Sequence, residues 1–328
     1  MSLPTVAIIG GTGFLGQQVS NAFLTDFRPS FSRIRVLTRD PSSQKAQDLA
    51  SKGAELIQYS GDELEKSFDE VFAGADVIVN ALPGGADKET KQAIIKAIAR
   101  SGAKVYFLSE FGSDHRINAF PGYESEEWLG KQEVAKETRA AFKGKVIALY
   151  TSAFIELAVK FPALGIDVKN NAFTAYGSPT TKISLTSLAD IGRAVAQLSI
   201  LATDPATAAS VPDDIRIAGD TVTIAGVRDI VARVKGVAPG EIKTVDVAPI
   251  KETLKGPSPQ FFDYLRRVAL FPLCPHGGDG MYSHAWVYNR VVLGEGKADF
   301  SSQNDNELVN PGGKLWKWKS VEEAIGGL

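Results

Sequence analysis

Hydrophobic and polar positions follow a regular rhythm along the first 150 residues. Short runs rich in Val, Ile and Leu alternate with stretches whose apolar residues recur every three or four positions, which predicts buried strands alternating with amphipathic helices. The expected strands are residues 6–9, 34–38, 55–59, 76–81, 104–108 and 145–150. This alternation is typical of an α/β fold of the Rossmann type, a doubly wound parallel sheet. Ligands of such sheets bind at the carboxyl ends of the strands, where the loops after the first, second, fourth and fifth runs emerge.

The rhythm loosens after the sixth run. A later helical stretch indicates a return to the main sheet, and its apolar residues are Leu188, Ile191, Val195 and Leu198. From about residue 203, short β-type runs and helices alternate with segments containing Pro and Gly. A chain of 328 residues also exceeds what one compact core usually holds. We therefore predict a Rossmann domain of residues 1–153 plus about 184–202, and a smaller α/β substrate-binding domain of about 154–183 and 203–328.

A glycine-rich segment separates the first expected strand from the helix after it. Its sequence is Gly10-Gly11-Thr12-Gly13-Phe14-Leu15-Gly16, with the glycine spacing GxxGxxG. Such a turn needs residues free to adopt positive φ, and a bound pyrophosphate needs bare backbone close by. The following helix directs unpaired N–H groups and its positive dipole end at the phosphates. Because strand and helix flank the motif, we favour a dinucleotide site over a structural turn without a ligand.

Arg39 follows the second expected strand, at the position that usually distinguishes NAD from NADP. Folds of this type that prefer NAD carry an acid there, which binds the ribose 2′-hydroxyl, whereas a guanidinium can pair with a 2′-phosphate and stack on adenine. Asp40 comes next in the chain, and the alternative for Arg39 is a solvated surface side chain. We expect NADP(H) as the cofactor.

Composition narrows the classes of function. Apolar residues make up 44% and charged residues 23% of the chain, as in ordinary globular proteins. The net charge of −2 and the absence of a dense basic run argue against direct binding of nucleic acid. No segment approaches the roughly 18 apolar residues of a membrane span, and the first strand begins too early to leave room for a signal peptide. We expect a cytoplasmic protein without a membrane segment.

Few side chains are available for a metal site. The single cysteine, Cys274, excludes an internal disulfide and a thiolate cluster. The three histidines, His115, His276 and His284, have no metal-ligand spacing with a carboxylate pair. We expect these histidines at the surface or in loops, and no metal.

Aromatic residues crowd the segment 261–286. They either line an apolar pocket for an aromatic substrate or form the core of the smaller domain, and we favour the core. The run Gly277-Gly278-Asp279-Gly280 has no strand before it, so we interpret it as a flexible lid rather than a phosphate loop.

A lysine on the helix expected over residues 125–142 is the candidate for proton chemistry. Classical short-chain dehydrogenases use Tyr-x-x-x-Lys, but none of the eight tyrosines has a lysine four residues later. At 100° per residue one stripe of this helix contains Trp128, Ala135, Thr138 and Phe142. Lys131 lies in that stripe, whereas Lys136 faces away. Burial of an ammonium without a partner is costly, so the inward position of Lys131 calls for an explanation. Either the side chain extends along the rim so that its ammonium stays in solvent, or the ammonium reaches the nicotinamide ribose and the reacting atoms. We favour the second alternative.

These segments together resemble a known family. The glycine motif, Thr38-Arg39 and the run Leu108-Ser109-Glu110-Phe111-Gly112-Ser113-Asp114 are similar to the NmrA-like, isoflavone-reductase-like branch of atypical short-chain dehydrogenases. The Ser-Glu-Phe-Gly stretch resembles the Pro-Ser-Glu-Phe-Gly signature of isoflavone and phenylcoumaran benzylic ether reductases, with Leu108 where proline is common. Lys131-Gln132-Glu133-Val134 resembles the family's Lys-x-x-Val, whose lysine contacts nicotinamide and is the proposed general acid/base. Residues 150–154 are similar to the loop that closes over the nicotinamide, without the asparagine often found there.

The motifs and the resemblance together define the expected site. The cofactor contacts expected are Gly10, Thr12, Gly13, Phe14, Leu15, Gly16, Arg39, Ala81, Leu82, Lys131 and Phe154. The substrate contacts expected are Glu110, Phe111 and Ile155. For Glu110, a carboxylate that accepts backbone N–H groups in its turn is the alternative that we favour over a substrate contact.

Two functions are consistent with these expectations. The first is an NADPH-dependent reductase of a small aromatic or conjugated substrate (an enone, quinone or quinone-methide-like compound), in which the cofactor supplies hydride and Lys131 protonates or stabilises the developing oxyanion. The second is implied by the family alone: a non-catalytic regulator that senses NADP(H) or NAD(H) and acts through a protein partner. Lys131 in its stripe favours the enzyme.

Overall fold

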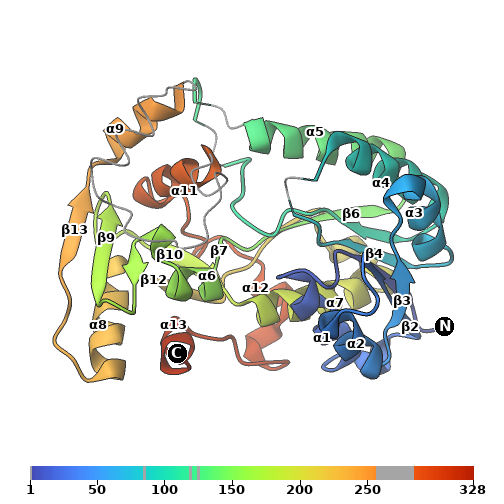
Figure 1. Cartoon of the computed structure of the whole chain (residues 1–328), viewed down its shortest axis with the longest axis horizontal. Coiled ribbons are helices and arrows are strands. Elements are labelled where there is room, and N and C mark those ends of the chain that lie inside the picture. The colour runs from blue at the N-terminus through green and yellow to red at the C-terminus, as the bar shows by residue number, and fades with distance from the viewer. Residues whose placement is uncertain (1, 84–85, 118–119, 124–125, 256–283) are drawn as a thin grey trace.

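The chain forms two lobes, with the N-terminus on one and the C-terminus on the other (Figure 1). The computed structural model describes residues 2–83, 86–117, 120–123, 126–255 and 284–328. The run 277–280, Cys274, His276 and most of the aromatic segment lie outside the described residues, so the lid and the two alternatives for those aromatic residues stay predictions.

The main lobe is built on a seven-stranded parallel sheet in the order β11-β6-β5-β4-β1-β2-β3. Its strands are β1 (Thr5–Ile9), β2 (Arg33–Thr38), β3 (Glu55–Gln58), β4 (Val77–Asn80), β5 (Val105–Phe107), β6 (Lys145–Tyr150) and β11 (Asp214–Arg216). The strand order reverses beside β1, which is the switch point where doubly wound sheets bind ligands. The predicted Rossmann-type sheet is confirmed, with each of its six expected strands present.

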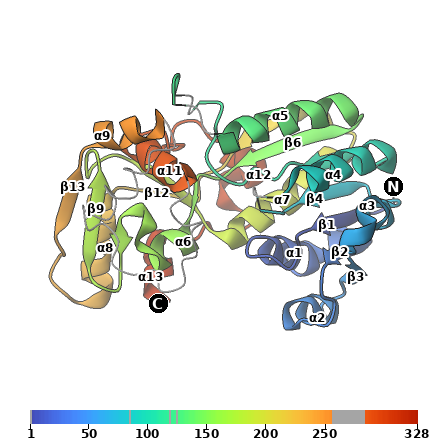
Figure 2. The same cartoon turned by 45° about the horizontal axis from the view of Figure 1, so that its top comes forward.

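Helices cover both faces of this sheet. They are α1 (Gly16–Leu24), α2 (Gln44–Ser51), α3 (Leu64–Phe72), α4 (Lys88–Ser101), α5 (Glu126–Ala141) and α7 (Leu188–Thr203). One face packs against α1 and α7, the other against α3, α4 and α5, and Figure 2 shows α4 and α5 on the side opposite α1.

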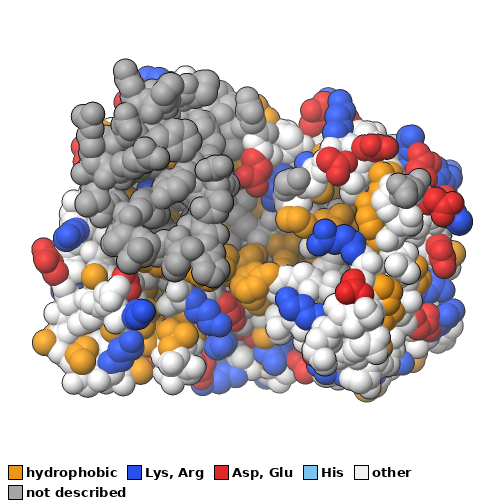
Figure 3. All heavy atoms as spheres, in the orientation of Figure 1, with side chains coloured by type: hydrophobic (Ala, Val, Ile, Leu, Met, Phe, Trp, Pro, Cys, Tyr) orange, Lys and Arg blue, Asp and Glu red, His pale blue; other side chains and the backbone are white. Residues whose placement is uncertain are grey.

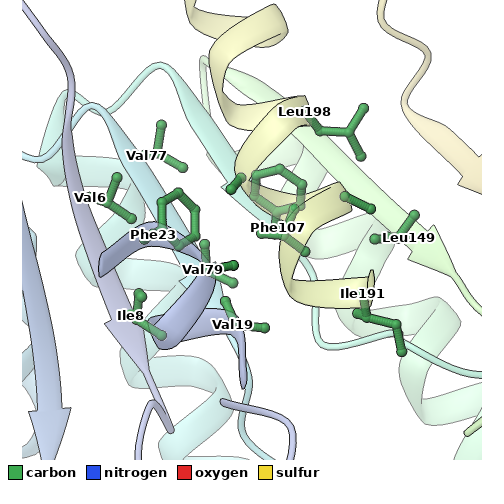
Figure 4. Packing of buried hydrophobic residues seen from close by; sticks show 14 of the residues in the cluster. Val6, Ile8, Val19, Phe23, Val77, Val79, Phe107, Leu149, Ile191 and Leu198 are labelled. Atoms are coloured by element: carbon green, nitrogen blue, oxygen red, sulfur yellow. The ribbon is translucent and has the colours of Figure 1, made fainter. Parts of the chain in front are cut away.

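The strands alternate between two cores. Val6 and Ile8 of β1 belong to the same core as Phe23 of α1 and Ile191 of α7, and Figure 4 shows these side chains among those of that core. Ala7 and Ile9 point the other way, into the core under α3, α4 and α5. A strand buried on both faces carries no polar position, which is why these runs are continuously apolar in the sequence.

The smaller lobe has a separate hydrophobic core. Its two three-stranded sheets contain β7 (Ala153–Phe154), β8 (Ile166–Asp167), β9 (Ala172–Tyr176), β10 (Ile183–Thr186), β12 (Asp220–Val222) and β13 (Ile242–Val245). The helices are α6 (Ile155–Lys160), α8 (Ile224–Lys235), α9 (Val247–Glu252), α11 (His284–Gly294) and α13 (Val321–Gly326), while the short α12 (Asn306–Val309) contributes Val309 to the main core.

The structure differs from the predicted domain boundaries at two short strands. β11 lies in the range expected for the smaller domain, yet it pairs with β6 of the main sheet. β10 lies largely in the range expected for the Rossmann domain, yet it pairs with β7 and β12. A strand of three or four residues contains too few apolar positions for the sequence to predict which strand it pairs with. The two-domain division itself stays a prediction.

In the described part of the chain, no helix is both long and apolar enough to cross a membrane. Nor does that part bring together three or more His, Cys, Asp or Glu side chains that could hold a metal ion.

Candidate functional site

The glycine turn between β1 and α1 is shaped by two close backbone contacts. Gly10 has a φ of +76°, and a Cβ on it would lie 2.7 Å from the carbonyl oxygen of Ala81. A Cβ on Gly16 would lie 2.0 Å from the carbonyl oxygen of Gly10. Gly13 closes the turn by donating its N–H to the Gly10 oxygen over 2.9 Å. The geometry of the turn therefore excludes a side chain at Gly10 and at Gly16, as the motif predicts.

This turn leaves backbone donors available. The N–H groups of Thr12, Phe14 and Leu15 donate to no acceptor within the described part of the chain. They stand at the start of α1, where the helix dipole is positive. Together with the bare glycine backbone, these donors form a cradle that fits a pyrophosphate.

A cavity of about 520 Å³ opens beside the turn. It lies at the carboxyl ends of β1, β2 and β4, the edge that the fold predicts, and its size suits a cofactor. Its lining residues are Gly10, Thr12, Gly13, Leu37, Thr38, Arg39, Lys45, Tyr59, Phe68, Ala81, Leu82, Pro83, Ala86 and Thr90. Of the expected cofactor contacts, the structure thus brings together three residues of the glycine motif, Arg39, and the two residues that follow β4.

Two cations line this cavity, Arg39 at the end of β2 and Lys45 in the first turn of α2. Both side chains are exposed, and neither forms an ion pair with a described residue. The Asp40 carboxylate forms no ion pair with either cation and instead accepts hydrogen bonds from the backbone N–H and the hydroxyl of Ser42 at 2.9 and 2.6 Å. These bonds lower the pKa of Asp40. The arrangement fits the doubly charged 2′-phosphate of NADP better than a ribose hydroxyl.

Lys131 lies next to this cavity, on α5. As the helical periodicity predicts, Ala135 and Thr138 of the same helix are buried and Lys136 is exposed. The Lys131 ammonium lies 3.3 Å from the carbonyl oxygens of Ser109 and Glu110, and 3.6 Å from the Glu110 carboxylate. It lines a small cavity of about 50 Å³ whose wall includes Leu82, Pro83 and Ala86, which also line the larger one.

The loop after β5 places Glu110 behind this lysine. The Glu110 carboxylate is almost fully buried and lies 3.2 Å from Nε2 of His115. His115 lies in a loop, as expected. It is only 3% exposed, so the alternative expectation of a surface position is wrong for this histidine. The neighbouring Tyr150 ring meets the His115 ring edge-on, and its pKa is raised, first by burial and then by the charge of Glu110.

An ion network fixes the same loop to the main sheet. Asp114 is fully buried and accepts hydrogen bonds from Arg116 and from Arg216, the last residue of β11. Burial alone would raise the pKa of Asp114, but the two guanidinium groups outweigh burial and lower it. Arg116 also pairs with Asp214 over 2.8 Å. β11 therefore pins the loop that carries Glu110 and His115.

A second cavity, of about 220 Å³, lies where the two lobes meet. In Figure 3 hydrophobic side chains gather in the hollow between the lobes. The cavity is lined by Phe111, Gly112, Ser113, Ser152, Ala153, Phe154, Leu157, Leu164, Asn289, Val292, Leu293 and Ala298. This lining is mostly apolar with a few hydroxyl and amide groups, which is typical of a binding site for a small molecule.

Two residues of this second cavity have unusual backbones. Phe111 and Ser152 both have positive φ, 29° and 54°. They face each other across Gly112, whose carbonyl oxygen accepts the N–H groups of Thr151 and Ser152 over 3.0 and 3.1 Å. Residues in such conformations persist where the surroundings hold them, and they concentrate at functional sites.

The remaining predicted site residues occupy different places. Phe154 and Phe111 line the second cavity, and Glu110 lines the small one beside Lys131. Phe14 is 54% exposed and Leu15 packs partly on the main core, so they flank the cofactor cavity rather than line it. Ile155 is fully buried in the core of the smaller lobe, and the structure does not bring it to a cavity.

Sequence reasoning missed three groups of site residues. Lys45 had a weak signal, since it stands in the first turn of the helix that follows Arg39. His115 had none, because nothing in the local pattern indicates that its loop folds under α5. Asn289 and Val292 come from α11, far along the chain, and only the tertiary fold brings them to the second cavity.

Comparison with known proteins agrees with this architecture. The family model described as the NmrA-like family matches residues 3–253. Among curated proteins, phenylcoumaran benzylic ether reductase PT1 of Pinus taeda is 36% identical over 113 residues, which is 33% of this chain and 36% of that protein. An NmrA-like family domain-containing oxidoreductase of Gibberella moniliformis is 25% identical over 232 residues, covering 68% of this chain and 75% of that one. The first of these matches thus spans about a third of its relative's length.

Solved structures resemble the whole chain. An isoflavone reductase superposes with a TM-score of 0.71 and 15% identity, covering 99% of each chain. AtPrR2, solved with NADP+ and (+)-pinoresinol, gives 0.70 with 18% identity and 99% coverage of each chain. NmrA, a negative transcriptional regulator solved with NADP, gives 0.69 with 15% identity, covering 100% of this chain and 96% of that one. At these identities the likeness shows the fold alone.

Proposed function

The chain belongs to the NmrA-like family, and from that premise we propose that it is an NADPH-dependent reductase of a small aromatic or conjugated substrate. The proposal rests on one observation above all: the Lys131 ammonium lies beside the cavity that contains the phosphate cradle, and it contacts Glu110, whose neighbour in the chain, Phe111, lines the mostly apolar cavity. The curated relatives named above include a phenylcoumaran benzylic ether reductase and an oxidoreductase, which supports a reductase.

The cofactor assigned to this site is NADP(H). The glycine turn would hold the pyrophosphate, with Arg39 and Lys45 at the 2′-phosphate. Solved neighbours of the same fold contain NADP or NADP+. When bound, the cofactor supplies a hydride to the electrophilic atom of the substrate.

The side chains of the protein would position the substrate and handle the proton. Phe111, Phe154 and Leu157 would enclose an aromatic ring in the second cavity, with Ser113 and Asn289 available for a phenolic or carbonyl oxygen. Lys131 would stabilise or protonate the oxygen on which negative charge develops. Its ammonium is ready for this because Glu110 provides a counter-charge at 3.6 Å.

A screen of NADPH absorbance with carbonyls, enones, quinones and phenolic ethers tests the function. We expect turnover with at least one aromatic member, and a Lys131→Ala variant with kcat lowered by about two orders of magnitude but with nearly unchanged affinity for NADPH. The matched control is Lys136→Ala on the exposed side of α5, which we expect to keep the parent kcat. Full turnover by Lys131→Ala would remove its assigned role.

The same screen distinguishes the enzyme from a cofactor-sensing regulator. A regulator binds nicotinamide cofactors without oxidising NADPH in the presence of any member of the panel. Titration of NADP+, NADPH, NAD+ and NADH, run beside the screen, measures that binding directly.

A further inference from the structure

A buried pair of side chains, Glu110 and His115, lies behind the site, and His115 has no part in the chemistry described so far. Each side chain is 3% exposed, and Oε2 of Glu110 lies 3.2 Å from Nε2 of His115. A carboxylate buried to this extent is costly unless it is hydrogen-bonded. The elements packed around the pair contribute Tyr150 from β6, and Trp128 and Gln132 from α5.

The contacts of the ring indicate where its proton lies. Nε2 of the Gln132 amide lies 3.4 Å from Nδ1 of His115. An amide nitrogen is a donor, so this contact favours Nδ1 as the acceptor and places the ring N–H at Nε2, facing Glu110. In this arrangement the ring donates to the Glu110 carboxylate and fixes its position.

One carboxylate oxygen connects this pair to Lys131. Oε2 of Glu110 is the atom nearest to His115, and it is also the atom that lies 3.6 Å from the Lys131 ammonium. The other two contacts of the ammonium are the carbonyl oxygens of Ser109 and Glu110, each at 3.3 Å. Any change that moves or neutralises Oε2 therefore alters the charge that Lys131 faces.

We propose that His115 is a positioning residue for Lys131: its ring N–H holds the Glu110 carboxylate in place, and Glu110 in turn orients the Lys131 ammonium. The consequence for catalysis rests on the proposed function, in which Lys131 serves as the acid. Without the His115 donor, Oε2 of Glu110 is no longer fixed beside Lys131, and the ammonium loses its oriented contact.

Three substitutions of His115 separate this role from simple packing. In His115→Gln the amide nitrogen lies three bonds beyond Cβ, like Nε2 of histidine, so the donor to Glu110 is retained. In His115→Asn the amide nitrogen lies two bonds beyond Cβ, near the place of Nδ1, and does not reach Glu110. His115→Leu fills the space without a donor. The Gln and Asn variants thus differ in whether the side-chain amide NH2 reaches the Glu110 carboxylate.

The first measurement follows the charge of Lys131 without any substrate. Competitive acylation at pH 8, read by mass spectrometry, gives the rate of Lys131 relative to the exposed Lys136 of the same helix. We expect this ratio to rise roughly tenfold in the Leu and Asn variants, because the ammonium is no longer held against an opposite charge within ~4 Å. The Gln variant should stay within about twofold of the parent protein, by the same reasoning. Melting temperature and affinity for NADPH show whether each variant is folded.

The second measurement is turnover. We expect kcat to fall roughly tenfold in the Leu and Asn variants with KM little changed, and the Gln variant to recover most of the loss. An acylation ratio that the Leu substitution leaves unchanged, or equal behaviour of the Gln and Asn variants, would overturn the proposal. If the parent protein reduces no substrate, the proposed function fails, whereas the acylation ratios still decide the role of His115.

Discussion

Arg39→Asp is the substitution that tests the cofactor site most directly. Arg39 and Lys45 line the cofactor cavity, and the Asp40 carboxylate accepts hydrogen bonds from Ser42 rather than pairing with either cation. Replacing the guanidinium by a carboxylate removes one cation from the 2′-phosphate and places an acid where a ribose hydroxyl can donate to it. We expect the preference for NADPH over NADH to be lost.

The size of the effect follows from the exposure of the site. A hydrogen bond to a charged group contributes about 1.5–3 kcal/mol, and the lower end applies because solvent screens the exposed Arg39 side chain. About 1.5 kcal/mol corresponds to roughly a tenfold change in Kd, and repulsion between the new carboxylate and the phosphate adds about as much again. The ratio of Kd for NADH to Kd for NADPH should therefore fall by about two orders of magnitude, and in Lys45→Ala by about one.

The assay is a fluorescence or calorimetric titration of both reduced cofactors at two salt concentrations. Higher salt should weaken NADPH binding by the parent protein more than by Arg39→Asp, because screening acts on the phosphate pair. Lys143→Asp makes the same change in net charge at an exposed position outside the cavity, and we expect it to keep the parent ratio. A ratio that is unchanged in Arg39→Asp would refute the assignment of the 2′-phosphate to this residue.

Three further predictions concern other parts of the site. Gly10→Ala would place a methyl group 2.7 Å from the Ala81 oxygen at a φ of +76°. We expect this variant to have a lower melting temperature and weaker NADPH binding than the parent protein. A melting temperature and a Kd equal to those of the parent would contradict the geometry described for the turn. Asp114→Asn removes a carboxylate whose pKa the protein lowers. Because a lowered carboxyl pKa stabilises the fold above the unfolded value of about 3.9 and less as pH falls through the folded value, the stability gap between parent and variant should narrow below about pH 4; a gap that is constant from pH 3 to 7 in urea unfolding would show that the charge is not responsible. Val292→Trp narrows the second cavity, so KM should rise more for large aromatic substrates than for small ones while Kd for NADPH stays constant, and a uniform effect on all substrates would place the substrate elsewhere.

The sequence predicted the main sheet well because each of its central strands is buried on both faces. Such a strand is an uninterrupted apolar run, and the glycine turn after β1 has a spacing that only a close backbone approach explains. The same local signals located Arg39 and the stripe of α5 that contains Lys131. These features depend on contacts within a few residues or on a repeated strand–helix unit.

Other features depend on contacts between distant segments, and the sequence does not reveal them. β11 has three residues and becomes a strand only by pairing with β6, some sixty residues earlier in the chain. His115 has the polar surroundings of a surface loop in the sequence, and only the packing of Trp128 and Tyr150 around it makes it buried. The wall contributed by α11 likewise depends on how the smaller lobe folds back on the main one.

The position of Arg216 has a consequence for the order in which the chain matures on the ribosome. The close backbone contacts of the glycine turn involve β1, α1 and the residue after β4, all of which lie within the first hundred residues. The loop after β5 must wait for Arg216, which arrives after the first strands of the smaller lobe have been made. A nascent chain can therefore bring together the residues that cradle a pyrophosphate well before it can lock Glu110 and His115 behind Lys131.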